Sequence, residues 1–183
     1  MSARFFDIAF TPSVLAAQQA NGARDRGSRS AGDQAPDRFT ASEAQFIAER
    51  DSFYMASVSE TGWPYVQHRG GPAGFLKLLD DRTLAFADFR GNRQYVSLGN
   101  LIANPRVALF LMDYPNRRRL KIYGHAEAVD LAADTDLADI VAAPGYRGLP
   151  ERAMKVRLEA FDWNCPQHIT PRYSAAEITQ RGS

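Results

Sequence analysis

Residues 91–129, GNRQYVSLGNLIANPRVALFLMDYPNRRRLKIYGHAEAV, limit the possible folds of this chain more than any other segment. Apolar side chains recur at helical spacing across residues 93–103, and Asn104-Pro105 ends that helix because the residue before a proline is pushed out of helical geometry. Residues 107–112 are apolar throughout, which predicts a central strand covered on both faces. Residues 119–128 then alternate between apolar and polar, as in a strand with one buried face.

The rest of the chain adds strands and helices that are joined by short connections. The pattern predicts strands at residues 53–59, 65–69, 75–79, 83–89 and 154–163, and helices at residues 12–20, after Thr40 and at residues 132–143. Thr40 and Glu43 fit a capping box, and Phe46 and Ile47 then lie on the buried face of that helix. Strands linked by short turns, without repeated strand–helix–strand crossovers, predict a mainly β fold: an antiparallel barrel with peripheral helices.

The length of 183 residues suits one well-buried domain with an appended arm. We expect residues 1–36 to form an N-terminal helix and a polar arm, because residues 23–38 are rich in polar side chains, Gly and Ser and lack periodicity. The arm is either a mobile loop or a segment that orders against a partner subunit. We expect residues 37–183 to form the barrel domain, including the C-terminal tail.

Charge and composition exclude several classes of function. The chain has 22 Lys and Arg and 21 Asp and Glu residues, and its net charge of +1 predicts neither a nucleic acid nor an acidic membrane as partner. No apolar run suits a signal peptide or a membrane span. Cys165 is the only cysteine, so we expect no disulfide framework and a cytoplasmic location. His68, His125 and His168 are too far apart to predict a metal site.

The first candidate binding segment is a strand that ends in two glycines. Gln67, His68 and Arg69 present polar groups, and Gly70-Gly71 lets a ligand approach the backbone closely. The same residues also fit a solvated edge strand that ends in a flexible turn.

The second candidate is the start of the helix at residues 93–103. Free amide groups and the helix dipole favour an anion there, and Arg93, next to Gln94, adds a forked donor that suits phosphate. Ordinary capping by Asn92, with the arginine in water, is the simpler explanation when this segment is taken alone.

The third and fourth candidates lie towards the C-terminus. Arg119 begins the polar face of an alternating strand and points the same way as Tyr123. The tail then brings together an indole, an amide, an imidazole and a guanidinium, which could contact a planar heterocycle: Trp163, Gln167, His168 and Arg172. The alternative is a terminal segment that packs in a dimer.

These segments together resemble the pyridoxamine 5′-phosphate oxidase-like family of FMN-binding split barrels. The resemblance covers residues 38–173, and its markers are GWPYVQHRGGPAGF (62–75), LAFADFRGNRQ (84–94), NPRVALFLMDY (104–114) and RRLKIYGHAEAV (118–129). It implies an antiparallel split β-barrel of about six strands with peripheral helices. It also implies a homodimer with FMN at the subunit interface.

The family's cofactor residues map onto twelve positions of this chain: Gln67, His68, Arg69, Ala87, Asp88, Arg93, Gln94, Arg119, Trp163, Gln167, His168 and Arg172. By resemblance, residues 67–69 and 93–94 hold the phosphate and ribityl chain, and residues 87–88 lie along the flavin. Arg119 falls where the family commonly has a glutamine that reaches FMN from the partner subunit. The four residues of the tail close the site near the ring.

The chain also departs from the true oxidases of the family. Gln67, Pro72 and Gln94 stand where those enzymes carry an arginine and two lysines. We therefore expect a branch other than the true oxidases, without pyridoxine phosphate oxidase activity. The expected function is that of an FMN-dependent oxidoreductase with a small-molecule substrate or electron donor. The alternative is a non-catalytic protein that binds flavin, haem or deazaflavin, and no catalytic residue can be assigned.

Overall fold

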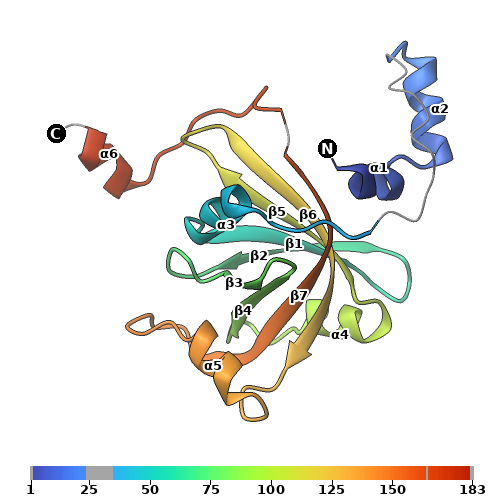
Figure 1. Cartoon of the computed structure of the whole chain (residues 1–183). Helices are drawn as coiled ribbons and strands as arrows, with labels where there is room; N and C mark the ends of the chain where they lie inside the picture. Colours follow the sequence, from blue (N-terminus) through green and yellow to red (C-terminus); the bar gives the residue numbers. More distant parts are fainter. Residues whose placement is uncertain (1, 24–34, 164, 182–183) are drawn as a thin grey trace.

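One seven-stranded antiparallel sheet forms the centre of the molecule (Figure 1). The computed structural model describes residues 2–23, 35–163 and 165–181. The strands are β1 (Ser52–Val58), β2 (Pro64–Gly70), β3 (Lys77–Asp80), β4 (Thr83–Phe89), β5 (Arg106–Asp113), β6 (Arg118–Val129) and β7 (Pro150–Trp163). The helices are α1 (Ala3–Ala9), α2 (Pro12–Ala20), α3 (Ala41–Ala48), α4 (Val96–Ala103), α5 (Thr135–Val141) and α6 (Ala175–Arg181).

The strand order is β2-β1-β5-β6-β7-β4-β3, and every neighbouring pair is antiparallel. The sheet curls around an apolar core to which β1, β4, β5, β6 and β7 all contribute. The strands β2 and β3 form its two edges, and each pairs with a neighbour on one side. This arrangement confirms the predicted mainly β split barrel, with seven strands rather than about six. The third strand begins at Lys77 and not at residue 75, because Phe75 and Leu76 are buried in the core just before it.

The strand β5 shows how the sheet is covered. Its side chains Val107, Leu109 and Leu111 are buried in the core, as predicted for a central strand. Phe110 and Met112 point the other way and are only half-buried. The prediction that both faces of this strand are covered is therefore wrong for a single chain, whose outward face is left partly open.

The capping box at α3 is confirmed. The amide of Thr40 donates to Glu43 Oε2 at 2.9 Å, and the indole Nε1 of Trp163 donates to Glu43 Oε1 at 2.7 Å. Phe46 and Ile47 are buried, as the sequence predicted, and Phe46 meets the Trp163 ring edge to face at 4.8 Å. One buried carboxylate thus fixes both the start of α3 and the end of β7.

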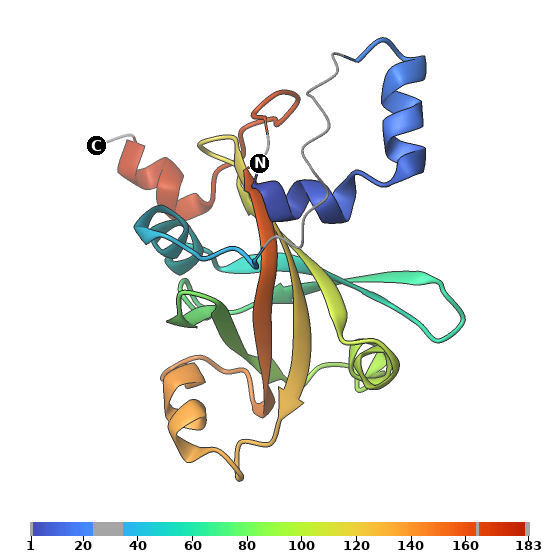
Figure 2. The ribbon, with the colours of Figure 1, turned by 45° about the vertical axis from the view of Figure 1, so that its right-hand side comes forward.

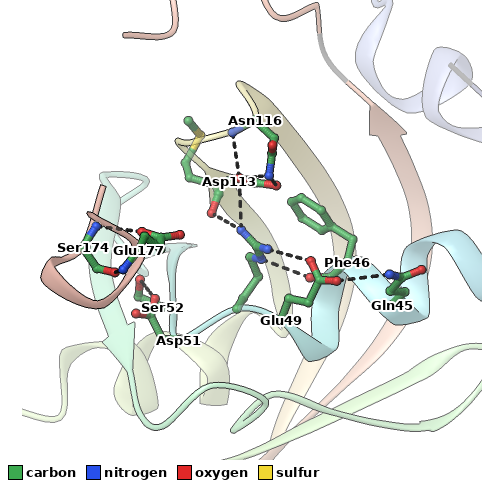
Figure 3. A network of polar contacts seen from close by, with 11 residues as sticks. Gln45, Phe46, Glu49, Asp51, Ser52, Asp113, Asn116, Ser174 and Glu177 are labelled. Carbon is green, nitrogen blue, oxygen red and sulfur yellow. Dashed lines mark hydrogen bonds and ion pairs between the residues drawn. The ribbon is translucent and has the colours of Figure 1, made fainter. Parts of the chain in front are cut away.

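The other end of α3 is held by Arg50. Figure 3 shows the polar network around Phe46, Asp113 and Asn116. Arg50 Nε donates to the carbonyl of Phe46 at 3.1 Å, and Nη1 donates to the carbonyl of Met112 at 3.1 Å. The same Nη1 lies 3.8 Å from Asp113, which accepts from the amide of Asn116 at 3.0 Å in the turn before β6. This network ties α3 to the β5–β6 hairpin.

The N-terminal segment contains two helices. The helix at Pro12–Ala20 was predicted with these bounds, whereas α1 was not predicted. Phe5 of α1 is buried and stacks on Tyr123 at 4.9 Å between ring centroids, so α1 lies on the outward face of the sheet. The helix α2 buries none of its residues and stands away from the barrel in Figures 1 and 2.

Other predictions for the two ends of the chain have mixed outcomes. Most of the predicted arm, residues 24–34, and Asn164 of the tail lie outside the described residues. Beyond residue 173 the chain forms α6, which the sequence did not predict. Within the described residues, no helix is both long and apolar enough to cross a membrane.

Glu43→Gln tests the buried carboxylate. We expect the free energy of unfolding at pH 7 to fall by about 1–3 kcal/mol, because hydrogen bonds from Thr40 and Trp163 are lost or weakened. Urea denaturation followed by tryptophan fluorescence measures this change. Glu60→Gln, in the exposed β1–β2 turn, is the matched control and should change little.

The same variant should reveal a pH dependence. Burial raises the pKa of Glu43, but the hydrogen bonds from Thr40 and Trp163 lower it by more, so the pKa lies below its usual value. The charged carboxylate therefore stabilises the fold above the unfolded-state pKa of about 4.3, and this contribution is lost as the pH falls through the folded-state pKa. The stability difference between wild type and Glu43→Gln should shrink in that acidic range. A difference that does not change with pH would contradict the assignment.

Candidate functional site

A pocket of about 220 Å³ lies where the ends of β2 and β4 meet the start of β7 and the start of α4. Four of the twelve predicted cofactor residues line it: Gln67, Arg69, Asp88 and Arg93. They come from three separate segments of the chain, which the sheet and the β4–α4 connection bring together.

Asp88, which lines this pocket, holds two arginines. Its Oδ1 accepts from Arg69 Nη1 at 2.5 Å, and its Oδ2 accepts from Arg152 Nη1 at 3.0 Å. Asp88 and Arg152 are direct neighbours in the β4–β7 ladder, so the carboxylate is placed by strand register. Arg69 Nε is buried and has no hydrogen-bond partner within the described part of the chain. Arg69 is thus fixed in direction by Asp88, while its Nε–H stays without a partner among the described residues.

Glu151 organises a second group of charges at the rim. It accepts from Arg90 Nε at 3.0 Å and from the hydroxyl of Tyr95 at 3.1 Å, and it lies 3.6 Å from Arg152. Burial raises the pKa of Glu151, but these hydrogen bonds and the nearby Arg152 and Arg90 charges lower it by more, so its carboxylate is charged at neutral pH.

The charges in and around the pocket do not cancel. The guanidinium groups of Arg69, Arg90, Arg93 and Arg152 face two carboxylates, those of Asp88 and Glu151. The excess of two positive charges matches the charge of a phosphate monoester near neutral pH.

The start of α4 is open to an anion. Its N-cap residue, Tyr95, has φ 52° and ψ 24°, and its side chain makes no capping hydrogen bond. Arg93 also has a positive φ, 60°. Two non-glycine residues in the left-handed region within three positions are uncommon, and such strain gathers at ligand sites. The first amides of α4 therefore lack a side-chain cap and favour a negative group.

Two hydrogen bonds connect α4 to β2 and β1. The hydroxyl of Ser97 donates to Gln67 Oε1 at 2.9 Å, and Asn100 Nδ2 donates to the hydroxyl of Ser57 at 2.9 Å. Gln67 therefore lies in the pocket with its carbonyl oxygen engaged, which orients its amide nitrogen.

The sequence did not reveal several residues of this site, among them Ser97, Glu151 and Arg152. Glu151 and Arg152 begin β7 more than sixty residues after Asp88, so only strand pairing shows that they meet it. Ser97 lies in the first turn of the observed α4, whereas the helix was predicted to begin at residue 93.

Three predicted residues near the pocket point elsewhere. His68 is exposed on the opposite face of β2, with its ring 5.6 Å from that of Tyr54. The side chain of Ala87 packs in a second apolar cluster with Leu137 and Val141 of α5. Gln94 is exposed, and its amide donates to Asn92 Oδ1 at 3.2 Å.

The remaining predicted residues lie at the far end of the sheet. Arg119 pairs with Met112 on the outward face, and its Nε is buried with no hydrogen-bond partner in the residues that the structure describes. Trp163 ends β7, about 40 Å from Glu151 along an extended strand. Arg172 lies over the ring of Tyr114 at 5.0 Å, and Gln167 and His168 are exposed. Within one chain the two halves of the predicted site do not meet.

Fold and pocket together define a split-barrel protein with an arginine-lined pocket. The family model of pyridoxamine 5′-phosphate oxidase matches residues 39–160, and the chain belongs to this family. This confirms the resemblance seen in the sequence. Among curated proteins, none matches the chain.

Solved structures with the same fold include HupZ of Group A Streptococcus, with a TM-score of 0.52, 14% identity and coverage of 74% of this chain and 100% of that one. An FMN-binding protein of Syntrophomonas wolfei has a TM-score of 0.52 and 11% identity, over 68% of this chain and 85% of that one. A pyridoxamine 5′-phosphate oxidase-type protein of Lactobacillus delbrueckii has a TM-score of 0.52 and 17% identity, over 68% and 93%. At these identities the likeness concerns the fold alone.

The described segments contain no group of three or more His, Cys, Asp or Glu side chains that could hold a metal ion.

Asp88→Asn tests the charge arrangement of the pocket. We expect the free energy of unfolding to fall by about 1.5–3 kcal/mol, because two guanidinium groups lose the carboxylate between them. Chemical denaturation at pH 7 measures the change. Asp139→Asn, an exposed carboxylate on α5, is the matched control. Equal stability of the two variants would show that Asp88 does not hold the arginines.

Proposed function

We propose that this protein binds FMN and acts as an oxidoreductase on a small molecule. The observation that carries the proposal is the uncapped start of α4, which faces an excess of arginine charge in the pocket. Such a site favours a phosphate group, and the family supplies the expectation of a flavin.

The residues present fit the phosphate end of FMN. Arg69 Nε is a buried donor without a partner among the described residues, and Arg93 lies beside the first amides of α4. Gln67 would contact the ribityl chain, while Asp88 keeps Arg69 in place. Bound FMN would supply hydride or electron transfer, and these side chains would bind and orient it.

The size of the pocket supports a site shared by two chains. Sites for small molecules usually measure about 300–1,000 Å³, so 220 Å³ suits the phosphate end and leaves the ring to be covered by something else. We infer that a second copy covers it, since Arg119 and the tail lie at the far end of the sheet. Gln167, His168 and Arg172 are exposed and suit this contact. Trp163 is already engaged by Glu43 and Phe46.

The outward face of the sheet supports the homodimer. Tyr54 is opposite Phe110, and Ala56 is opposite both Val66 and Ala108, so the outer sides of β2, β1 and β5 form one apolar surface. Tyr54 is 41% exposed and Val66 is 60% exposed. Contiguous apolar surface of this kind marks an interaction site.

The substrate in this proposal differs from that of the true oxidases, because Gln67, Pro72 and Gln94 stand in place of their cations. A protein of the same fold from Syntrophomonas wolfei is described as FMN-binding, which supports the cofactor and not the substrate. Non-catalytic flavin binding is the alternative, and turnover distinguishes the two. Reduction of the bound flavin by NADH, NADPH or another donor, followed by reoxidation, supports the enzyme; a flavin that no donor reduces supports the binding protein.

Arg93→Ala tests the cofactor site. Purified wild-type protein should be yellow or take up one FMN per chain. The variant should bind FMN more weakly by about 1.5–3 kcal/mol, because one charge-assisted phosphate contact is lost. Fluorescence titration of FMN measures the affinity, and Arg147→Ala, an exposed arginine outside the pocket, is the control. A wild-type protein that takes up no FMN would refute the proposal, and unchanged affinity in Arg93→Ala would refute the assigned pocket.

Val66→Glu tests the dimer. The side chain is exposed in a single chain, so the fold should be kept, while a charge on the apolar surface should shift the protein to monomers and weaken FMN binding. Sedimentation velocity across a range of concentrations measures this shift. Ile140→Glu, which places the same charge on an exposed apolar residue of α5, should leave the dimer intact. If Val66→Glu remains dimeric, this face is not the interface.

A further inference from the structure

The molecule has a second, larger pocket on the outward side of the sheet. Its volume is about 630 Å³, and side chains from the β3–β4 turn, β6 and β7 line it, together with Arg38 ahead of α3. It shares no residue with the pocket at the start of α4. Its size lies within the range usual for sites that hold small molecules.

Basic side chains form a row across this region. Strand register places Thr83 opposite Arg157, Arg157 opposite His125, and His125 opposite Arg106, on four successive strands. Directly opposed side chains share one face, with about 5 Å between their Cβ atoms. Arg82, in the turn beside Thr83, also lines the pocket. Arg157, His125 and Arg106 therefore lie along one line of the sheet, and Arg82 lines the same pocket as Arg157.

The carboxylates of the pocket already have other partners. Asp81 accepts from Arg38 at 2.6 Å, and Glu127 lies 3.6 Å from Lys155. Asp80 accepts from the amide of Arg82 at 2.7 Å. That backbone hydrogen bond is the main reason why the pKa of Asp80 lies below its usual value.

Two arginine side chains keep donors without a partner among the described residues. The side chain of Arg157 is exposed and makes no hydrogen bond or ion pair with that part of the chain. Arg82 Nε is buried and has no hydrogen-bond partner in the same part of the chain. Arg157 lies opposite Thr83 in the β4–β7 ladder, so Arg82, the residue before Thr83, and Arg157 border the same pocket.

We propose that this pocket is a second binding site, for a small molecule that carries a phosphate group. The anion lies between Arg82 and Arg157, whose guanidinium groups match phosphate oxygens in forked geometry. The site rests on its own residues and does not depend on the proposed FMN site.

A neighbouring hollow indicates what accompanies the phosphate. A pocket of about 400 Å³ lies beside α1, and His125 lines both pockets. Ile8, Val107 and Tyr123 give this second hollow apolar walls. A ligand with an apolar or aromatic group next to its phosphate would use both, so an aromatic phosphate should bind more tightly than inorganic phosphate.

The test is calorimetric titration of the FMN-saturated protein with inorganic phosphate and with phenyl phosphate. We expect both to bind, phenyl phosphate more tightly. Arg157→Gln and Arg82→Gln should each weaken phenyl phosphate binding about tenfold or more, because a charge-assisted contact is lost. Arg147→Gln, an exposed arginine outside both pockets, should bind as wild type does, and thermal melting confirms that each variant is folded.

Failure of this proposal can be told apart from failure of the FMN site. No binding of either probe at millimolar concentration, or equal affinity in Arg157→Gln and Arg147→Gln, overturns the second site. Binding that Arg93→Ala weakens and Arg157→Gln does not would place the phosphate in the pocket at α4 and overturn it too. If the protein takes up no FMN, the same titrations on the colourless protein still decide the question.

Discussion

The fold depends on the ladder between β6 and β7, which joins the strands β2, β1 and β5 to β4 and β3. Its register shifts after Tyr123, where β7 carries one extra residue, Glu159. A Cβ on Gly124 would lie 2.6 Å from the carbonyl oxygen of Arg157, so only glycine permits this close approach. The extra residue is not left unsatisfied: its carbonyl accepts from the amide of Asp37 at 3.1 Å, and its carboxylate accepts from Arg4. One bulge thus anchors both N-terminal segments to the sheet.

The length of the same ladder separates the chemistry at its two ends. Glu151, at the start of β7, belongs to the arginine-lined pocket, and Trp163, at its end, is held by α3. The strand β7 is fourteen residues long and pairs along its length with β4 and β6. It therefore keeps the tail and the pocket of the same chain apart. A flavin that contacts both would need two chains, and the partly open outward face of β5 supplies a surface on which they could meet.

The sequence could predict those elements and residues whose position depends only on neighbours along the chain. Alternation in residues 119–128 and the pair Thr40 and Glu43 depend only on near neighbours, and both elements formed as expected. The seven residues of α1 are too short to be stable alone, and Phe5 on Tyr123 is a contact that no local pattern shows. The pocket is similar: Arg69 and Arg93 were visible as basic residues beside glycines and a helix start, whereas Arg152 becomes part of it only through its pairing with Asp88.

The net charge of +1 conceals how the arginines are used. Asp88 prevents Arg69 and Arg152 from repelling one another, and Glu151 does the same for Arg90 and Arg152. These carboxylates reduce the positive potential of the pocket, but they also fix the guanidinium groups before any ligand arrives. A phosphate would then contact donors that need little reordering. This preorganisation offsets part of the electrostatic attraction that the two carboxylates remove. At Arg157 no carboxylate among the described residues plays this part, so a ligand there would gain more from charge and lose more to ordering.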